Sequence, residues 1–205
     1  MERMLRVGLT GGLASGKSSV AAFLRGLGAV VFDADQIVKD LYAPGGAGAQ
    51  AARELFGDAV LDASGMIDRS RIAAIVFADP AKRHALEARI HPLVRAERAR
   101  RFAEAEKSGA SVAVAEASQL LESNSEGDYD RVVLVVAPEA ERIRRWERKG
   151  GDAQDASRRI RSQMSPSTAF DRAHDVLTND GTLEELREKV EALWQKWAKG
   201  TSTVT

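Results

Sequence analysis

The feature that most constrains this chain is a glycine-rich segment between an apolar stretch and a helical pattern. The apolar stretch covers residues 7–10, and apolar side chains return at helical spacing over residues 20–27. The segment between them reads Gly11-Gly12-Leu13-Ala14-Ser15-Gly16-Lys17-Ser18, which matches the pattern G-x-x-x-x-G-K-[ST] in full. Strand, loop and helix in this order predict a P-loop, which binds the phosphates of a nucleoside triphosphate.

The chemistry of phosphate binding explains this pattern. Glycines let successive backbone N–H groups turn toward an anion, and the helix that follows adds its positive N-terminal end. Lys17 can then bridge the β- and γ-phosphates, and the Ser18 hydroxyl can ligate Mg²⁺. The alternative, a glycine turn followed by an exposed lysine, is disfavoured by the strand before the motif and the helix after it.

Four further apolar segments are expected to complete a sheet, at residues 29–32, 112–115, 131–137 and 175–178. Continuous apolar runs are typical of parallel strands that are covered on both faces. Five strands with intervening helices predict an α/β fold, a P-loop NTPase with a doubly wound five-stranded parallel sheet. We expect the second strand to lie next to the P-loop strand.

Two stretches without strands interrupt this alternation. Residues 40–109 are expected to contain a long helix, which Asp79-Pro80 begins and which ends near Lys107. Residues 139–172 are expected to contain two helices separated by Gly150-Gly151. We interpret both stretches as helical insertions above the carboxyl ends of the sheet. The expected organisation is one domain over residues 1–205, with a core of residues 1–39, 110–138 and 173–200, an acceptor-binding insertion at 40–109, a lid at 139–172 and a frayed tail at 201–205.

Composition excludes several classes of function. The chain has 205 residues, with 30 basic and 30 acidic side chains, so its net charge gives no general attraction to nucleic acid or anionic membrane. It has no cysteine, which excludes a disulfide scaffold, a zinc–thiolate site and a cysteine nucleophile. Its longest apolar run, residues 132–137, is far shorter than the roughly 18 residues of a membrane span. The charged start predicts no signal peptide. We therefore expect a cytoplasmic protein, a monomer or weak homo-oligomer, with neither nucleic acid nor membrane as partner.

Two aspartates follow the second expected strand. If the chain stays extended through Ala34, the carboxylates of Asp33 and Asp35 point the same way. One of them could accept a proton from an attacking hydroxyl or hold water on magnesium. Asp35 could instead simply cap a helix that begins at Gln36. The residues alone leave both interpretations open.

Several segments, in the right order, resemble the dephospho-CoA kinase family. They are the P-loop with its flanks at residues 8–20, the segment Phe32-Asp33-Ala34-Asp35-Gln36-Ile37, the segment Ile90-His91-Pro92-Leu93, and Gln163 followed by residues 173–181. The likeness extends from residue 5 to about residue 197. It implies an ATP-dependent kinase that uses Mg²⁺ and phosphorylates the ribose 3′-hydroxyl of dephospho-CoA, giving CoA and ADP in the last step of coenzyme A biosynthesis.

The resemblance also implies roles for individual residues. Asp35 would orient or deprotonate the hydroxyl, while Lys17 and Arg145 would act on the phosphates. The expected ATP-binding residues are Gly11, Gly12, Leu13, Ala14, Ser15, Gly16, Lys17, Ser18, Ser19, Arg145 and Arg148. The expected acceptor-binding residues are Thr10, Asp33, Asp35 and His91.

The acidic residue that would assist Ser18 in binding Mg²⁺ is expected after the third strand. The family usually carries Val-Pro-Leu-Leu-x-Glu there, whereas this chain has no proline between Val112 and Glu122. Glu116 and Glu122 are therefore both candidates, and Glu116 is the one we expect to be the metal residue.

The expected lid is rich in arginine. Residues 141–161 hold eight Lys or Arg against four Asp or Glu. A solvated helical face is the ordinary explanation, but a P-loop core favours arginines that close over the charge of the transferring phosphoryl group. Among the histidines, His84 and His174 are expected at the surface or in packing. His91 either fills the hydrogen-bond gap beside Pro92 or lines the acceptor site.

Two other functions remain as alternatives. The same scaffold could phosphorylate another small acceptor, such as a nucleoside monophosphate or shikimate. A GTPase-like switch is less favoured. Asp62-Ala63-Ser64-Gly65 fits the pattern D-x-x-G, but it follows no convincing buried strand, and the chain has no Asn-Lys-x-Asp segment.

Overall fold

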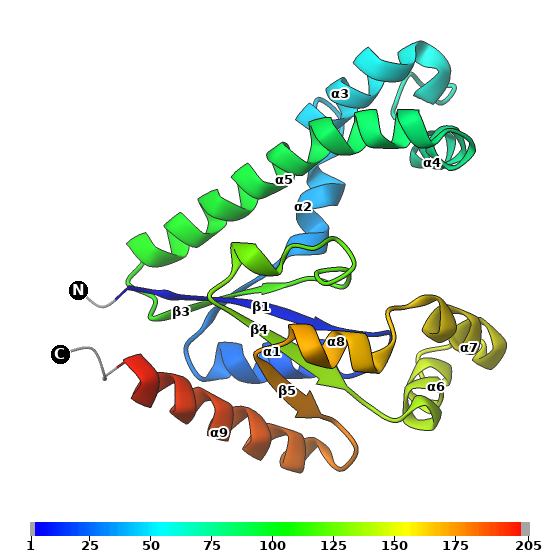
Figure 1. Cartoon of the computed structure of the whole chain (residues 1–205). Helices are drawn as coiled ribbons and strands as arrows, with labels where there is room; N and C mark the ends of the chain where they lie inside the picture. The colour runs from blue at the N-terminus through cyan, green and yellow to red at the C-terminus, as the bar shows by residue number, and fades with distance from the viewer. Residues whose placement is uncertain (1–2, 202–205) are drawn as a thin grey trace. The chain divides into compact units, whose positions relative to one another are not determined.

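A computed structural model describes residues 3–201 of the chain (Figure 1). Most of the expected frayed tail, residues 202–205, lies outside the described residues. The chain forms two compact units, which are described separately below. The first comprises the residues up to Asp33 and from Glu104 onward, and the second comprises Ala34–Ala103.

The first unit is built on a sheet of five parallel strands, in the order β2-β3-β1-β4-β5. The strands are β1 (Leu5–Gly11), β2 (Val30–Asp33), β3 (Val112–Glu116), β4 (Arg131–Val136) and β5 (Asp175–Thr178). The predicted α/β fold with a doubly wound five-stranded parallel sheet is thereby confirmed.

One expectation about this sheet is wrong, because β2 does not lie next to β1. Strand β3 separates them, and its Val114 is opposite Val7 of β1 on one side and Val31 of β2 on the other. The chain leaves the sheet after β2, passes through the second unit, and returns as β3 between β2 and β1.

Side chains of the sheet alternate between two helical layers. Val133, Val135 and Leu177 share one core with residues of α1 (Lys17–Gly26) and α9 (Leu183–Thr201). Helix α8 (Pro166–Arg172) packs against β4 on the opposite face (Figure 1). Each fully buried aliphatic side chain of such a core contributes about 1.5–3 kcal/mol to the free energy of unfolding. Packing of the helices on both faces therefore stabilises the sheet and the positions of its carboxyl ends.

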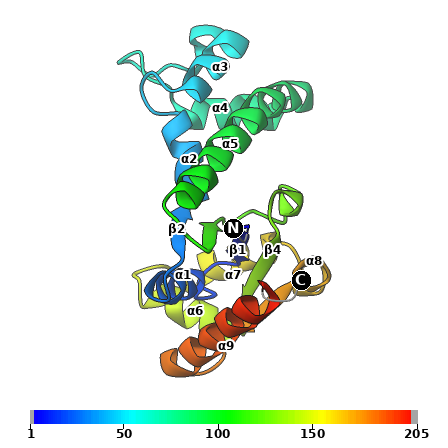
Figure 2. The ribbon, with the colours of Figure 1, turned by 90° about the vertical axis from the view of Figure 1, so that its left-hand side faces the viewer.

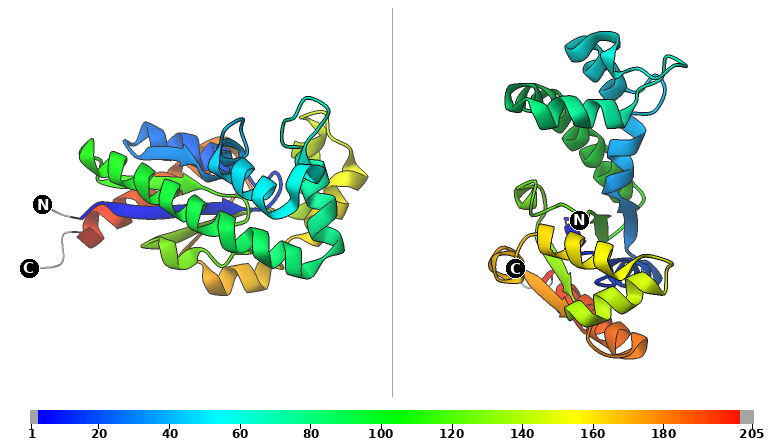
Figure 3. Two further views of the ribbon diagram at one scale, coloured as in Figure 1. Left: turned by 90° about the horizontal axis from the view of Figure 1, so that it is seen from above. Right: turned by 90° about the vertical axis from the view of Figure 1, so that its right-hand side faces the viewer.

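Residues 139–172, the expected lid, follow β4 and belong to the first unit (Figure 3). Helix α6 spans Glu139–Glu147 and α7 spans Ala153–Ser162. A β-carbon at Gly151 would overlap the Trp146 indole, so the glycine pair between the helices allows a close turn. Helix α7 begins before the expected residue 155, since the Asp152 carboxylate caps it by accepting from the Asp155 N–H at 2.8 Å.

The second unit is helical, with α2 (Ala34–Leu41), α3 (Ala47–Phe56), α4 (Arg69–Ala78) and α5 (Pro80–Lys107), which ends just beyond it (Figure 2). Its own core includes Ala52, Ile72, Leu86 and Ile90. The long helix expected from Asp79-Pro80 is confirmed, and it runs without interruption through Pro92. No helix among residues 3–201 has the length and apolar character that crossing a membrane requires.

Candidate active site

The P-loop connects the end of β1 to the start of α1. Ala14 and Gly16 both have positive φ angles, 54° and 101°, which turn the backbone around the loop. Gly16 is required for a second reason, because a β-carbon there would overlap the side-chain amide of Asn179. Helix α1 begins at Lys17 with neither a side-chain cap nor an acidic residue in its first turn. Its N-terminal N–H groups are therefore suited to binding an anion.

Lys17, Ser18, Glu116 and Ser118 form a polar cluster beside the P-loop. The Lys17 ammonium donates a hydrogen bond to Ser118 Oγ at 2.7 Å and lies 3.9 Å from Glu116 Oε1. The Ser18 hydroxyl donates to the same Glu116 oxygen at 3.0 Å. Glu116 is the last residue of β3 and lies level with Leu9 of β1, so the sheet register places this acid beside the P-loop.

This cluster suits a magnesium ion. Mg²⁺ prefers oxygen ligands and is usually held by one or two carboxylates together with substrate phosphates and water. The hydroxyl of Ser18 and the carboxylate of Glu116 supply two such oxygens. The described part of the chain contains no group of three or more His, Asp or Glu placed to hold a metal. With two protein oxygens, the cluster fits an ion that takes its other ligands from substrate phosphates and water.

The carbonyl side of the P-loop is held by Asn179 and Arg145. The backbone oxygen of Ser15 accepts hydrogen bonds from Asn179 Nδ2 at 2.8 Å and from Arg145 Nη1 at 3.3 Å. Arg145 Nη2 also donates to the backbone and side-chain oxygens of Asn179, at 3.1 and 3.2 Å. Asn179 is buried and follows directly after β5. These contacts occupy the Ser15 carbonyl oxygen. The N–H groups of the loop are left to bind a ligand.

Arg142 of α6 and Gln163, which directly follows α7, hold the first half of the P-loop. Arg142 Nε donates to the backbone oxygen of Leu13 at 2.7 Å, and its Nη2 donates to Gln163 Oε1 at 2.5 Å. The same Gln163 oxygen accepts from the Leu13 N–H at 3.2 Å. Burial lowers the pKa of the Arg142 guanidinium, while the nearby Glu139 raises it. One positive charge is thus placed beside the phosphate loop.

Sequence reasoning missed the roles of Arg142, Asn179 and Ser118. Arg142 precedes Arg145 by three residues, so helical spacing alone puts both on one face of α6. Arg148 behaves differently: its side chain is exposed and donates to the backbone oxygen of Arg144 in its own helix, at 3.4 Å. The structure therefore brings Arg145 to the P-loop and places Arg148 at the surface of α6.

Both sequence interpretations of Asp33 and Asp35 are wrong in one respect. Helix α2 begins at Ala34, so the chain is not extended through that residue, and the helix does not wait until Gln36 to begin. Asp33 is the last residue of β2 and lies opposite Glu116 of β3, whereas Asp35 lies in the first turn of α2. An acidic side chain in a first helical turn is favourable because it faces the positive end of the helix.

The histidines have separate places. His84 is exposed, with Nδ1 3.5 Å from a Glu87 oxygen, and His174 accepts a hydrogen bond from the Val132 N–H at 3.1 Å. Both are therefore surface or packing residues, as expected. His91 is an exposed residue of α5 in the second unit.

The segment that fits D-x-x-G forms a structural turn. Asp62 Oδ1 accepts hydrogen bonds from the backbone N–H groups of Ser64 and Met66, and Leu61 and Ile67 pair across the turn. The hydrogen bonds from Ser64 and Met66 lower the pKa of Asp62. This hydrogen bonding explains the Asp and Gly of the segment, so it offers no support for a GTPase-like switch.

Comparison with known proteins identifies the family. The family model for dephospho-CoA kinase matches residues 5–185. The dephospho-CoA kinase of Frankia casuarinae is 43% identical over 192 residues, covering 94% of this chain and 83% of that protein. The dephospho-CoA kinase of Chlorobaculum tepidum is 40% identical, covering 93% of this chain and 94% of its own.

Solved structures agree with these sequence matches. TT1252 from Thermus thermophilus is 35% identical with a TM-score of 0.75, over 95% of this chain and 98% of that one. The dephospho-CoA kinase of Campylobacter jejuni is 23% identical with a TM-score of 0.69, and it supports the fold. Because the family model covers most of the chain and the expected motifs lie within that match, the resemblance is confirmed: the chain belongs to the dephospho-CoA kinase family.

Proposed function

We propose that this protein transfers the γ-phosphoryl group of ATP to the ribose 3′-hydroxyl of dephospho-CoA, giving CoA and ADP in the last step of coenzyme A biosynthesis. Family membership supports the choice of acceptor. The observation that carries the chemistry is the contact of Lys17 and Ser18 with Glu116 beside a P-loop. This cluster combines the cation, hydroxyl and carboxylate that Mg·ATP binding uses.

The phosphates of ATP would be bound by this chain's own backbone and cations. The N–H groups of residues 11–19 and the N-terminus of α1 would surround them, with the Lys17 ammonium on the β- and γ-phosphates. Arg145 would neutralise charge that develops during transfer, with Arg148 as a second candidate. Ser18 and Glu116 would hold Mg²⁺, which when bound neutralises the phosphate oxygens.

The acceptor hydroxyl needs a group that takes its proton. In the proposed step, the 3′-oxygen forms a bond to the γ-phosphorus, the bond to the ADP oxygen breaks, and the hydroxyl proton passes to a carboxylate. Asp35 is our proposed base or orienting residue. Asp33, the last residue of β2, is the alternative. A carboxylate that orients or deprotonates the acceptor is the usual arrangement in phosphoryl transfer.

The remaining expectations stay part of the proposal. The lid of residues 139–172 would close over ATP, and the insertion of residues 40–109, with His91, would bind the acceptor together with Thr10 and Asp33. The cytoplasmic location, the absence of nucleic acid and membrane partners, and the monomer or weak homo-oligomer expected from the sequence stay predictions.

An ADP-release assay with a panel of acceptors tests this function. Mg·ATP is supplied with dephospho-CoA, adenosine monophosphate, thymidine monophosphate or shikimate, each in turn. The proposal predicts turnover with dephospho-CoA and at most background rates with the others. Turnover of shikimate or a nucleoside monophosphate, without dephospho-CoA activity, would reject it. The similarity to shikimate kinase from Bacteroides thetaiotaomicron, 13% identical with a TM-score of 0.52, concerns the fold alone and does not favour that acceptor.

A further inference from the structure

A cavity of about 330 Å³ lies on the sheet face that α8 covers, next to the start of the P-loop. Its walls come from Thr10 and Gly11 at the end of β1, Leu134 of β4, Thr178 of β5 and Ala169 of α8. Leu134 and Thr178 alternate along their strands with Val133 and Leu177, which pack with α1 and α9, while Val135 borders both that core and the cavity. The cavity therefore lies on the side of the sheet away from α1.

This position separates the cavity from the base of ATP. The α- and β-phosphates bind along the end of a P-loop and the first turn of its helix, here Gly16 to Ser19. The adenosine of ATP is attached to the α-phosphate, so the adenine base must lie beyond the α-phosphate end of the phosphate chain. The cavity walls include Gly11, Gly12 and Ser15 of the loop but none of Gly16 to Ser19. A group seated in the cavity therefore approaches the phosphate loop from the other side, as an acceptor must.

The chemistry of the walls favours a flat apolar group over an anion. The apolar residues of the wall include Leu121, Leu134, Met164, Ala169 and Phe170. Among the lining residues the single cation is Arg142, which already donates to Leu13 and Gln163. Two carboxylates, Glu122 and the Lys189-paired Asp180, also line the cavity, so the wall lacks the cluster of cations that a diphosphate favours. A volume of about 330 Å³ is at the small end for ligand sites, so the cavity suits a ring system rather than a complete nucleotide with a long arm.

Resting on the proposed function, we propose that this cavity binds the adenine base of dephospho-CoA. The ribose that carries the reacting 3′-hydroxyl has two large substituents, the base and the 5′-diphosphate with its pantetheine arm. The largely apolar walls, whose one cation is already hydrogen-bonded to Leu13 and Gln163, favour the base. Seating adenine here would place the ribose at the start of the P-loop, where the transferred phosphoryl group must arrive.

Polar groups in the wall match the edge of adenine. Gln163 uses its side-chain oxygen for Leu13 and Arg142, and its amide nitrogen has no hydrogen-bond partner among residues 3–201. That amide can donate to a ring nitrogen of adenine, while the Glu122 carboxylate can accept from the exocyclic amino group. Guanine presents a carbonyl oxygen at the position of that amino group, and the carboxylate would disfavour it.

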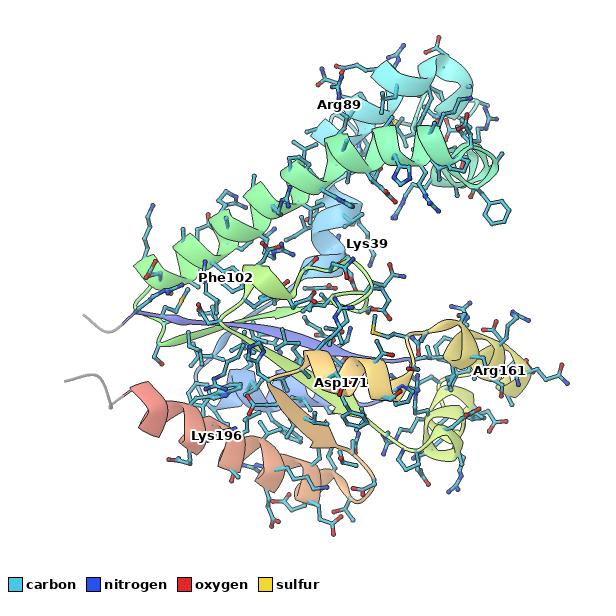
Figure 4. The ribbon with its side chains drawn as sticks, viewed as in Figure 1. Lys39, Arg89, Phe102, Arg161, Asp171 and Lys196 are labelled. Atoms are coloured by element: carbon cyan, nitrogen blue, oxygen red, sulfur yellow. The ribbon has the colours of Figure 1, made fainter. Side chains whose placement is uncertain are left out.

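Filling the cavity from α8 tests the proposal. Ala169→Leu adds apolar atoms where the structure has open volume, and Asp171→Leu makes a matched change two residues later on the exposed side of the same helix (Figure 4). We expect Ala169→Leu to raise the KM for dephospho-CoA about tenfold or more, the scale of a steric mismatch in a binding pocket. The KM for ATP should stay within about twofold, and Asp171→Leu should change neither constant. Thr178→Leu, which fills the cavity from β5, should reproduce the result if Ala169→Leu lowers the melting temperature.

A second substrate separates loss of the base contact from general damage. An analogue of dephospho-CoA without its adenine ring should bind the wild type about tenfold or more weakly than dephospho-CoA, and Ala169→Leu should bind the two compounds nearly equally. If the folded variants keep the wild-type KM for dephospho-CoA, or raise only the KM for ATP, the assignment of the cavity to adenine is wrong. If the wild type itself does not phosphorylate dephospho-CoA, the proposed function fails instead.

Discussion

The P-loop unit and the unit of residues 34–103 position their polar side chains by different means. In the P-loop unit, hydrogen-bonded strands set the positions, so Glu116 lies level with both Leu9 and Asp33. The helical unit has no sheet, and many of its charged contacts are exposed pairs such as Arg89 with Glu54. Backbone register thus fixes the groups proposed to bind ATP, whereas helix packing positions Asp35, the proposed base, and His91. Substitutions at these two sets of residues should therefore affect different steps.

Lys17→Ala should have the largest effect, because it removes a half-buried cation from the P-loop unit. We expect kcat/KM to fall by about 10³-fold, the upper range for loss of one group that stabilises transition-state charge. ATP binding should weaken as well. Titration calorimetry with Mg·ATP and steady-state kinetics measure the two effects. Lys82→Ala, the same change at an exposed position of the helical unit, should alter neither.

Asp35→Asn should lower turnover and leave ATP binding intact, which is the behaviour expected of the helical unit. Removing a general base costs about 10²-fold or more in kcat. Asparagine keeps the size of the side chain, although it loses the favourable charge at the start of α2, worth about 0.3–1 kcal/mol. Steady-state kinetics and the melting temperature distinguish these effects. If Asp35→Asn keeps near-normal turnover while Asp33→Asn loses it, the base is Asp33 at the end of β2. The proton acceptor would then belong to the P-loop unit and not to the helical unit.

Asn179→Ala should destabilise the P-loop conformation, because Asn179 holds the carbonyl side of the loop. The substitution removes the 2.8 Å hydrogen bond to the Ser15 carbonyl and a partner of Arg145, so we expect a loss of about 1–3 kcal/mol in the free energy of unfolding. The affinity for Mg·ATP should fall several-fold. Urea unfolding and ATP titration check both results. Asp180→Ala removes an exposed ion pair with Lys189 and a carboxylate of the cavity wall, but no contact with the P-loop, so ATP binding should stay unchanged. An equal loss of ATP affinity in both variants would contradict the bracing role of Asn179.

The smallest effect is expected at Glu97 of α5, in the helical unit. Hydrogen bonds from Arg100 and then Arg101 hold the pKa of this carboxyl at about 2, below its ordinary value of 4.5. A lowered folded-state pKa contributes stability above the unfolded-state pKa, and this stability is lost as pH falls from about 4.5 to about 2. Glu97→Gln should therefore lower stability at pH 7 by about 0.5 kcal/mol or less, with the difference vanishing near pH 2. Urea titrations across this range measure the difference, and one that grows as pH falls would contradict the assignment.

Much of the P-loop unit could be predicted because its signals are local. The apolar runs and the pattern of Gly11, Gly16 and Lys17 specify strand, loop and helix without reference to the rest of the chain. The order of the strands could not be predicted in this way. The position of β3 between β1 and β2 depends on how the chain returns after the 34–103 unit, which no short segment encodes.

The errors at the site have equally particular causes. Of the two interpretations of Asp35, one kept the chain extended through Ala34 and the other began a helix at Gln36, whereas α2 begins at Ala34. Boundary shifts of about one or two residues change where an aspartate carboxylate points. Helix α8 was not expected, although its start carries a recognisable signal: Ser165 caps it and Pro166 follows at the first position. The contact of Glu116 with Ser18 required the sheet register, since the two residues are 98 positions apart.

The most direct test of the central claim is identification of the product. The wild-type protein is incubated with Mg·ATP and dephospho-CoA, and the mixture is analysed by ³¹P nuclear magnetic resonance and by chromatography against authentic CoA. The account predicts one new phosphomonoester resonance, that of a ribose 3′-phosphate, with CoA and ADP formed in equal amounts. Release of ADP without CoA, or a phosphate on any other position of the acceptor, would contradict it.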